Sequence, residues 1–200
     1  METGSGDIIF GAVVLAIVVV LAIVAGRMLN KYKNNRFAKA WAPLVTIIDG
    51  TIVNDNGGAA SSYLAGTYKG KKVQACMIPN RNQYAGESGG TRYNYFEIGL
   101  KGITGRNDWT ISYKYGLLGF GKTGWHINAQ DKSLEERLHS AGVIDMITPF
   151  GKPAITFKVT QVTLLYSDDI TPLWVPEPRH FKEQLGLLLL LSKVNEQVNQ

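Results

Sequence analysis

The sequence predicts an α+β protein: one N-terminal transmembrane helix, then a mainly antiparallel sheet domain with two packed helices. Three observations predict this class. Residues 8–26 form a charge-free apolar run, period-2 alternation recurs between residues 96 and 159, and two later segments carry helix start signals. The expected organisation is a short extracytoplasmic tail, a transmembrane helix, a basic juxtamembrane segment and an α+β domain, at residues 1–7, 8–26, 27–42 and 43–200.

The apolar run is long enough to cross a bilayer as a helix. It contains no charged residue from Ile8 to Gly26, and a span needs roughly 20 apolar residues. A cleaved signal peptide is the alternative, but such peptides begin with basic residues and have a shorter apolar stretch. Here the first seven residues hold Glu2, Asp7 and no base, and Gly26 is followed directly by Arg27. These features favour a retained anchor.

The basic residues that follow predict the orientation. Lys and Arg prefer the cytoplasmic flank of a span, and all 21 of them lie after Gly26. We therefore expect the N-terminus outside and the domain in the cytoplasm, with the span in the cell inner membrane. Amphipathic rings and cations favour the lipid interface and its anionic headgroups. The candidate interface residues are Arg27, Lys31, Tyr32, Lys33, Arg36, Phe37, Lys39 and Trp41.

The same segment accounts for most of the net charge of +5. Residues 40–200 hold 16 bases and 14 acids, so the domain is close to neutral. A nucleic-acid-binding domain needs a basic stripe on its folded surface. We therefore expect no nucleic-acid partner.

Alternating apolar residues predict at least four half-buried strands. A short Gly-containing link, Lys69-Gly-Lys-Lys72, predicts a hairpin. Short strands with short links favour antiparallel pairing, in which one face can meet water. The alternating sets are Phe96, Ile98 and Leu100; Trp109, Ile111, Tyr113 and Tyr115; Trp125, Ile127 and Ala129; and Ile155, Phe157 and Val159.

The first domain helix is predicted at Ser133-Leu-Glu-Glu136. This is a capping-box pattern, Leu134 and Leu138 share a helical face, and Gly142 is a stop signal.

The second helix is predicted from about Pro178 toward Val198. Its run of five leucines, residues 187–191, covers the whole circumference of a helix. Some of them are therefore expected to face a partner, although a helix enclosed within its own domain is an equal alternative. The candidate partner-interface residues are Leu187, Leu188, Leu190, Leu191 and Val194.

A glycine-rich segment matches the phosphate-binding pattern G-x-x-x-x-G-K-[ST] through Gly116, Gly121, Lys122 and Thr123. That loop must open a helix whose N-terminus receives the anion. Here the following residues, Gly124-Trp-His-Ile-Asn-Ala, alternate as a strand does. A hairpin loop is therefore favoured, and a membrane-tethered nucleotide-binding enzyme remains the alternative.

No catalytic group, cofactor site or metal site is predicted. The three histidines are far apart, and Cys76 is the single cysteine. It lies in a strand-like run, where a small apolar filler is the expected role.

Several short motifs carry a resemblance over about residues 45–199. They are Gly66-Thr-Tyr-Lys-Gly-Lys-Lys-Val73, Phe96-Glu-Ile98, Asp108-Trp109, Leu134-Glu-Glu-Arg-Leu138 and the closing Phe181, Gln184-Leu185 and Val194-Asn-Glu-Gln-Val-Asn199. The chain resembles an uncharacterised α+β domain of bacterial single-pass membrane-anchored proteins. The resemblance implies a terminal helix packed on the sheet and brings no catalytic residues.

These observations together favour a non-catalytic accessory or scaffold subunit of a larger membrane complex, whose partners are other subunits and the bilayer. The other candidates are the nucleotide-binding enzyme and a sensor module that reads the lipid surface through residues 27–39.

Overall fold

The computed structural model describes residues 5–53, 63–80, 93–114, 123–170 and 176–199. The description leaves out the side chains of residues 5–13, 29–37, 78–80, 93–95 and 169–170. The chain divides into two compact units, Met1–Ala40 and Trp41–Gln200. The second unit begins close to the predicted domain boundary at residue 43.

Helix α1 covers Ser5–Ile47 and supplies nearly all of the first unit. Every described residue from Val14 to Met28 is exposed. Across the described residues, no helix has both the length and the apolar character that a membrane crossing needs. Residues 8–13 lie outside the described side chains. The helical conformation of residues 8–26 is confirmed, and a membrane crossing by them stays a prediction.

The last turns of α1 belong to the core of the second unit. Trp41, Leu44 and Ile48 are fully or almost fully buried. The Trp41 ring meets Phe96 edge-on at a centroid distance of 6.3 Å, and Phe96 meets Phe181 in the same way at 6.1 Å. The placement of Trp41 at a lipid interface is therefore wrong, because its indole lies among the aromatic rings of the domain core.

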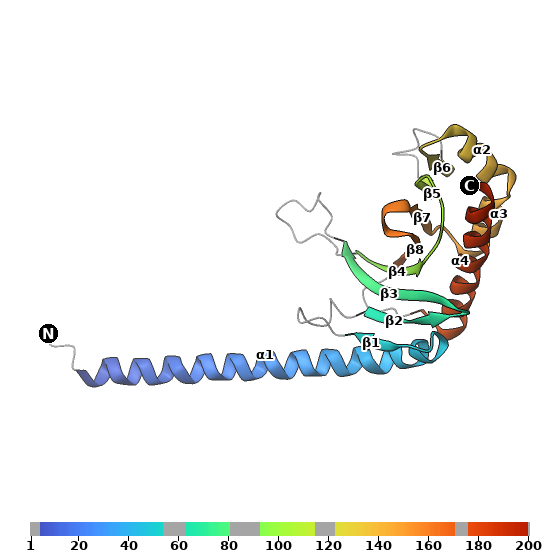
Figure 1. Ribbon diagram of the computed structural model, residues 1–200. Coiled ribbons are helices and arrows are strands. Elements are labelled where there is room, and N and C mark those ends of the chain that lie inside the picture. The colour runs from blue at the N-terminus through green and yellow to red at the C-terminus, as the bar shows by residue number, and fades with distance from the viewer. Residues whose placement is uncertain (1–4, 54–62, 81–92, 115–122, 171–175, 200) are drawn as a thin grey trace. The chain divides into compact units, whose positions relative to one another are not determined.

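Eight strands form one antiparallel sheet within the described residues, as the alternation predicted (Figure 1). Its order is β1-β2-β3-β4-β8-β7-β5-β6, so β8 lies between β4 and β7. The strands are β1 (Thr51–Val53), β2 (Tyr63–Tyr68), β3 (Lys71–Asn80), β4 (Tyr93–Lys101), β5 (Trp109–Lys114), β6 (Gly124–Ala129), β7 (Ala154–Lys158) and β8 (Thr163–Ile170).

A two-residue turn and a close backbone contact fix the position of β2. The predicted hairpin is confirmed: Lys69 and Gly70 both have positive φ, which suits the twist of a two-residue hairpin. Close to this turn, the Thr67 N–H of β2 donates to the Ile48 carbonyl at 2.5 Å. A Cβ on Gly66 would lie 2.4 Å from that carbonyl oxygen, so the end of α1 packs against β2 only because residue 66 is glycine.

One face of the sheet is apolar and is covered by α4 (Pro178–Val198). Figure 1 shows α4 running across the strands, and it contacts β4 and β8. Gln184 of α4 donates from Nε2 to the hydroxyl of Tyr166 on β8 at 3.1 Å. The buried side chains on this face include Leu64, Val73, Phe96, Ile98, Leu100, Ile111, Ile155, Phe157 and Leu164.

Two shorter helices pack against α4. Helix α2 (Lys132–Ser140) and helix α3 (Val143–Ile147) both contact α4. They are followed by a 3-10 turn, η2 (Thr148–Phe150), and a second one, η3 (Val159–Gln161), precedes β8.

The start of α2 differs from the prediction. Its N-cap is Asp131, whose Oδ1 accepts from the Ser133 N–H at 2.9 Å and whose Oδ2 accepts from the Ser133 hydroxyl. These hydrogen bonds lower the pKa of the Asp131 carboxyl. The capping box assigned to Ser133 is therefore wrong, because the cap lies two residues earlier. The stop at Gly142 is confirmed by its φ of 68°.

The structure also corrects the prediction that the leucine run of α4 faces a partner. Leu187, Leu188, Leu191 and Val194 are all buried, and only Leu190 is exposed, at 46%. The helix packs on the sheet and also contacts α2 and α3, while its opposite side is exposed. The four buried candidates therefore pack within their own domain, which was the alternative.

Candidate functional site on the open sheet face

The face of the sheet away from α4 carries a shallow cavity of about 260 Å³. Polar side chains from three neighbouring strands, β3, β4 and β8, meet there with one residue of η3. Antiparallel pairing sets Cys76 opposite Glu97 and Gln74 opposite Gly99. The lining residues are Gln74, Cys76, Glu97, Gly99, Lys101, Gln161, Thr163 and Leu165.

Gly99 forms the floor of this cavity. A Cβ at this position would lie 3.2 Å from Leu165 Cδ2 and 3.3 Å from Thr163 Cγ2. Even one methyl group would therefore crowd the neighbouring strand. The glycine keeps the cavity open between Cys76 and Glu97 on one side and Lys101 on the other.

Glu97 and Cys76 dominate the electrostatics of the cavity. Burial raises the pKa of the Glu97 carboxyl. Burial, and secondarily the charge of Glu97, raises the pKa of the Cys76 thiol to about 11. The thiol is therefore protonated at neutral pH. Among the described residues, the Glu97 carboxylate has no hydrogen-bond or ion-pair partner.

This arrangement is suited to binding rather than to nucleophilic chemistry by the thiol, because only a thiolate is a strong nucleophile. The cavity offers an acceptor at Glu97, amides at Gln74 and Gln161, and an ammonium at Lys101. The Thr163 hydroxyl donates to the Gln161 carbonyl at 2.7 Å and so positions that turn. A polar side chain from another protein would find complementary groups here.

Most of the residues of the phosphate-loop candidate lie outside the described part of the chain. Gly116, Gly121 and Lys122 lie outside the described residues, and Thr123 is exposed just before β6. The flanking strands β5 and β6 pair directly, with Lys114 opposite Gly124. Residues 115–123 therefore join two antiparallel strands, whereas a phosphate-binding loop leads from a strand into a helix.

The other predicted site residues are not brought together. Arg27 is exposed on α1, as is Lys39. Lys31, Tyr32, Lys33, Arg36 and Phe37 lie outside the described side chains. Within the described part of the chain, no group of His, Cys, Asp and Glu is placed to hold a metal ion.

Sequence reasoning missed the open-face cavity. Its members come from three segments that only the strand register brings together, and each segment looks like an ordinary polar strand face. No family model, curated protein or solved structure matches the chain. The resemblance seen in the short motifs therefore stays a prediction.

Proposed function

We propose that the chain is a non-catalytic accessory subunit of a larger membrane complex, anchored by residues 8–26. One observation carries the proposal: the described apolar side chains of α1 are exposed in an unbroken series from Val14 to Val24. Consecutive helix positions point in all directions, so this surface surrounds the helix. A single protein face would cover only one stripe of it.

The energetic argument favours lipid as the surrounding medium. Nine large apolar side chains between Val14 and Val24 are 43–66% exposed. Moving a half-exposed side chain of this size out of water is worth about 1 kcal/mol. The described part of the segment alone would gain roughly 10 kcal/mol on insertion.

The second part of the proposal concerns the partner surface. Because four of the five candidate residues on α4 are buried, they are not available to another subunit. The open sheet face is the better candidate, since its cavity holds a half-buried carboxylate without a partner in the described structure. A donor from another subunit would satisfy Glu97, which favours a cationic or amide side chain as the docking group.

The linker limits where such a partner can lie. Residues 27–40 separate the apolar segment from Trp41, which is fixed in the domain core. These fourteen residues belong to helix α1 and span about 21 Å at a rise of roughly 1.5 Å per residue. The proposed partner is therefore a protein at the membrane, on the cytoplasmic side according to the charge of this linker.

Purification of the full chain from its native membrane in mild detergent, followed by mass spectrometry, tests the proposal. We expect stoichiometric co-purifying membrane subunits, and their loss in a Glu97→Lys variant. Glu136→Lys, the same charge change on the exposed face of α2, is the matched control and should keep them. A lone monomer would reject the complex, and retention of all subunits by Glu97→Lys would reject the open face as the interface.

The anchor has its own test. The full chain should stay with vesicles during flotation in alkaline carbonate. Ile17→Asp combined with Leu21→Asp should release it, since each centrally placed acid costs about 2.5–3.5 kcal/mol of insertion free energy. Release of the unaltered chain by carbonate would exclude the anchor.

A further inference from the structure

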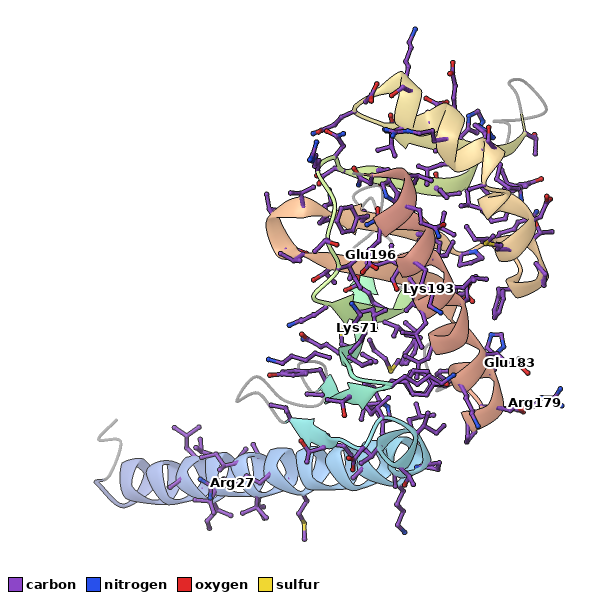
Figure 2. The ribbon with its side chains drawn as sticks, turned by 45° about the vertical axis from the view of Figure 1, so that its right-hand side comes forward. Arg27, Lys71, Arg179, Glu183, Lys193 and Glu196 are labelled. Atoms are coloured by element: carbon purple, nitrogen blue, oxygen red, sulfur yellow. The ribbon has the colours of Figure 1, made fainter. Side chains whose placement is uncertain are left out.

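A second hollow lies between the β2–β3 turn and the outer face of α4. Its volume is about 480 Å³, within the range of small-molecule binding sites. The turn contributes Lys69 and Lys71, and α4 contributes Leu189, Leu190, Lys193 and Glu196. Figure 2 shows Lys71, Lys193 and Glu196 on this part of the surface. We call these six residues the lysine groove.

The charges of the lysine groove are unevenly balanced. Lys71 lies 3.5 Å from Glu196 and also donates to the Gly102 carbonyl at 3.3 Å. That ion pair neutralises the one carboxylate lining the groove. Among the described residues, neither Lys69 nor Lys193 has an ion-pair partner. The groove is therefore complementary to a ligand with one or two negative charges.

The groove also has apolar side chains, and in this it differs from a purely charged patch of surface lysines. Leu190 is 46% exposed, and among the described residues of 41–200 the only other exposed large apolar side chain is Val162. Leu189 beside it is half-buried. On the turn, the Lys69 ammonium lies 5.7 Å from the centre of the Tyr68 ring. An aromatic ring, an exposed leucine and two lysines therefore lie together here, and these types of side chain are common where a protein meets lipid headgroups.

We propose that the lysine groove binds the phosphate headgroup of an anionic phospholipid, with Leu189 and Leu190 contacting the carbons next to that headgroup. The choice of lipid over an acidic peptide rests on the proposed membrane anchor, because the helical residues 27–40 keep the start of the domain within about 21 Å of a bilayer surface. Anionic lipid is then present at a high effective concentration. The groove is distinct from the basic residues at 27–39.

A titration with soluble short-chain lipid tests this without requiring insertion. The probe is an environment-sensitive fluorophore on Gly186→Cys in a Cys76→Ser background, in the full chain in neutral detergent. Gly186 lines the groove, and a Cβ there meets nothing within 4 Å. We expect a saturable response to dihexanoyl-phosphatidylglycerol and none to dihexanoyl-phosphatidylcholine. Lys69→Ala with Lys193→Ala should weaken the affinity at least about tenfold.

The matched control is Lys114→Ala with Lys132→Ala, which removes two exposed lysines on β5 and α2, neither of which lines the groove, and should leave the affinity unchanged. An equal response to both lipids, or no effect of the groove variant, would overturn the proposal. So would an equally tight response to inorganic phosphate, or binding of an acidic Glu-Leu peptide without lipid binding. Flotation of the full chain reports on the anchor separately, so failure of one inference is distinguishable from failure of the other.

Discussion

The indole Nε1–H of Trp109 on β5 donates a 2.7 Å hydrogen bond to the side-chain carbonyl of Asn195 on α4. The Asn195 amide then donates to the Thr104 carbonyl at 2.6 Å, and its oxygen also accepts from Asn199 at 3.2 Å. The Asn199 side chain in turn bonds the backbone of Asn107 twice: its Oδ1 accepts from the Asn107 N–H, and its Nδ2 donates to the Asn107 carbonyl. Two asparagines one helical turn apart therefore tie α4 to the segment between β4 and β5.

Asn195→Ala should destabilise the domain by about 2–4 kcal/mol, because it leaves the buried Trp109 N–H without its acceptor and also removes the donor to the Thr104 carbonyl. Urea unfolding followed by tryptophan fluorescence measures this. Gln197→Ala, on the exposed side of the same helix, is the control. A cost below about 0.5 kcal/mol would show that the network contributes little.

Gly66→Ala and Gly186→Ala should change stability in opposite directions. A Cβ on Gly66 meets the Ile48 carbonyl oxygen at 2.4 Å and the Gly50 Cα at 2.7 Å, both backbone atoms that cannot move independently. We expect a loss of about 1–3 kcal/mol or more. Gly186 lies inside α4 with open space around it, so alanine should gain about 0.5–1 kcal/mol. Thermal unfolding of both variants provides the comparison.

Val162→Asn should stabilise the protein by about 1 kcal/mol. Val162 has a φ of 49°, a left-handed conformation that is costly for a β-branched residue and tolerated by asparagine. The side chain is 43% exposed, so little burial is lost. The backbone carbonyl still accepts from Gly102 and Ile103. An unchanged or lower midpoint in urea would contradict the strain argument.

Cys76 should react slowly with iodoacetamide in the folded protein. With its pKa raised from 9.0 to about 11, the thiolate fraction at pH 8 falls about 100-fold. The rate should climb steadily as the pH rises toward 11. Urea-unfolded protein should react as an ordinary thiol. Equal rates in the folded and unfolded states at pH 8 would show that burial does not protect the thiol.

Glu97→Gln should stabilise the domain at pH 7 and have less effect in acid. Burial raises the folded-state pKa of Glu97 above its ordinary 4.5. Its contribution to stability is therefore fully present below the unfolded pKa and is lost as pH rises through the folded pKa. The gain is modest because the side chain is only half-buried. Unfolding free energies at pH 4 and pH 7 measure it, and a larger gain at pH 4 would reverse the assigned sign.

Much of the sheet follows from the sequence. The alternation at residues 96–100, 109–113 and 125–129 predicted β4, β5 and β6, since half-buried strands need it. The ends of α4 also match, because Pro178 is well suited to a first turn.

The errors have a common physical origin. Trp41 and the leucines of α4 were assigned to outside partners because a one-dimensional pattern shows that a side chain is apolar but not which neighbour covers it. Trp41 meets Phe96, which is far along the chain, and α4 is covered by α2 and α3 as well as by the sheet. The open-face cavity was missed for the same reason, since Cys76, Glu97 and Thr163 become neighbours only through strand register.

The packing of α4 also bears on how the protein is made. All eight strands of the described sheet are synthesised before α4, yet this helix covers the apolar side of β4 and β8. Until then, residues such as Ile98 and Leu164 lack the cover that α4 provides, and the contact between Trp109 and Asn195 closes a loop of 86 residues. Such late, long-range closure is slow and leaves nascent apolar surface open to aggregation. The domain is therefore expected to complete its folding only after translation of α4, and to depend on chaperones until that moment.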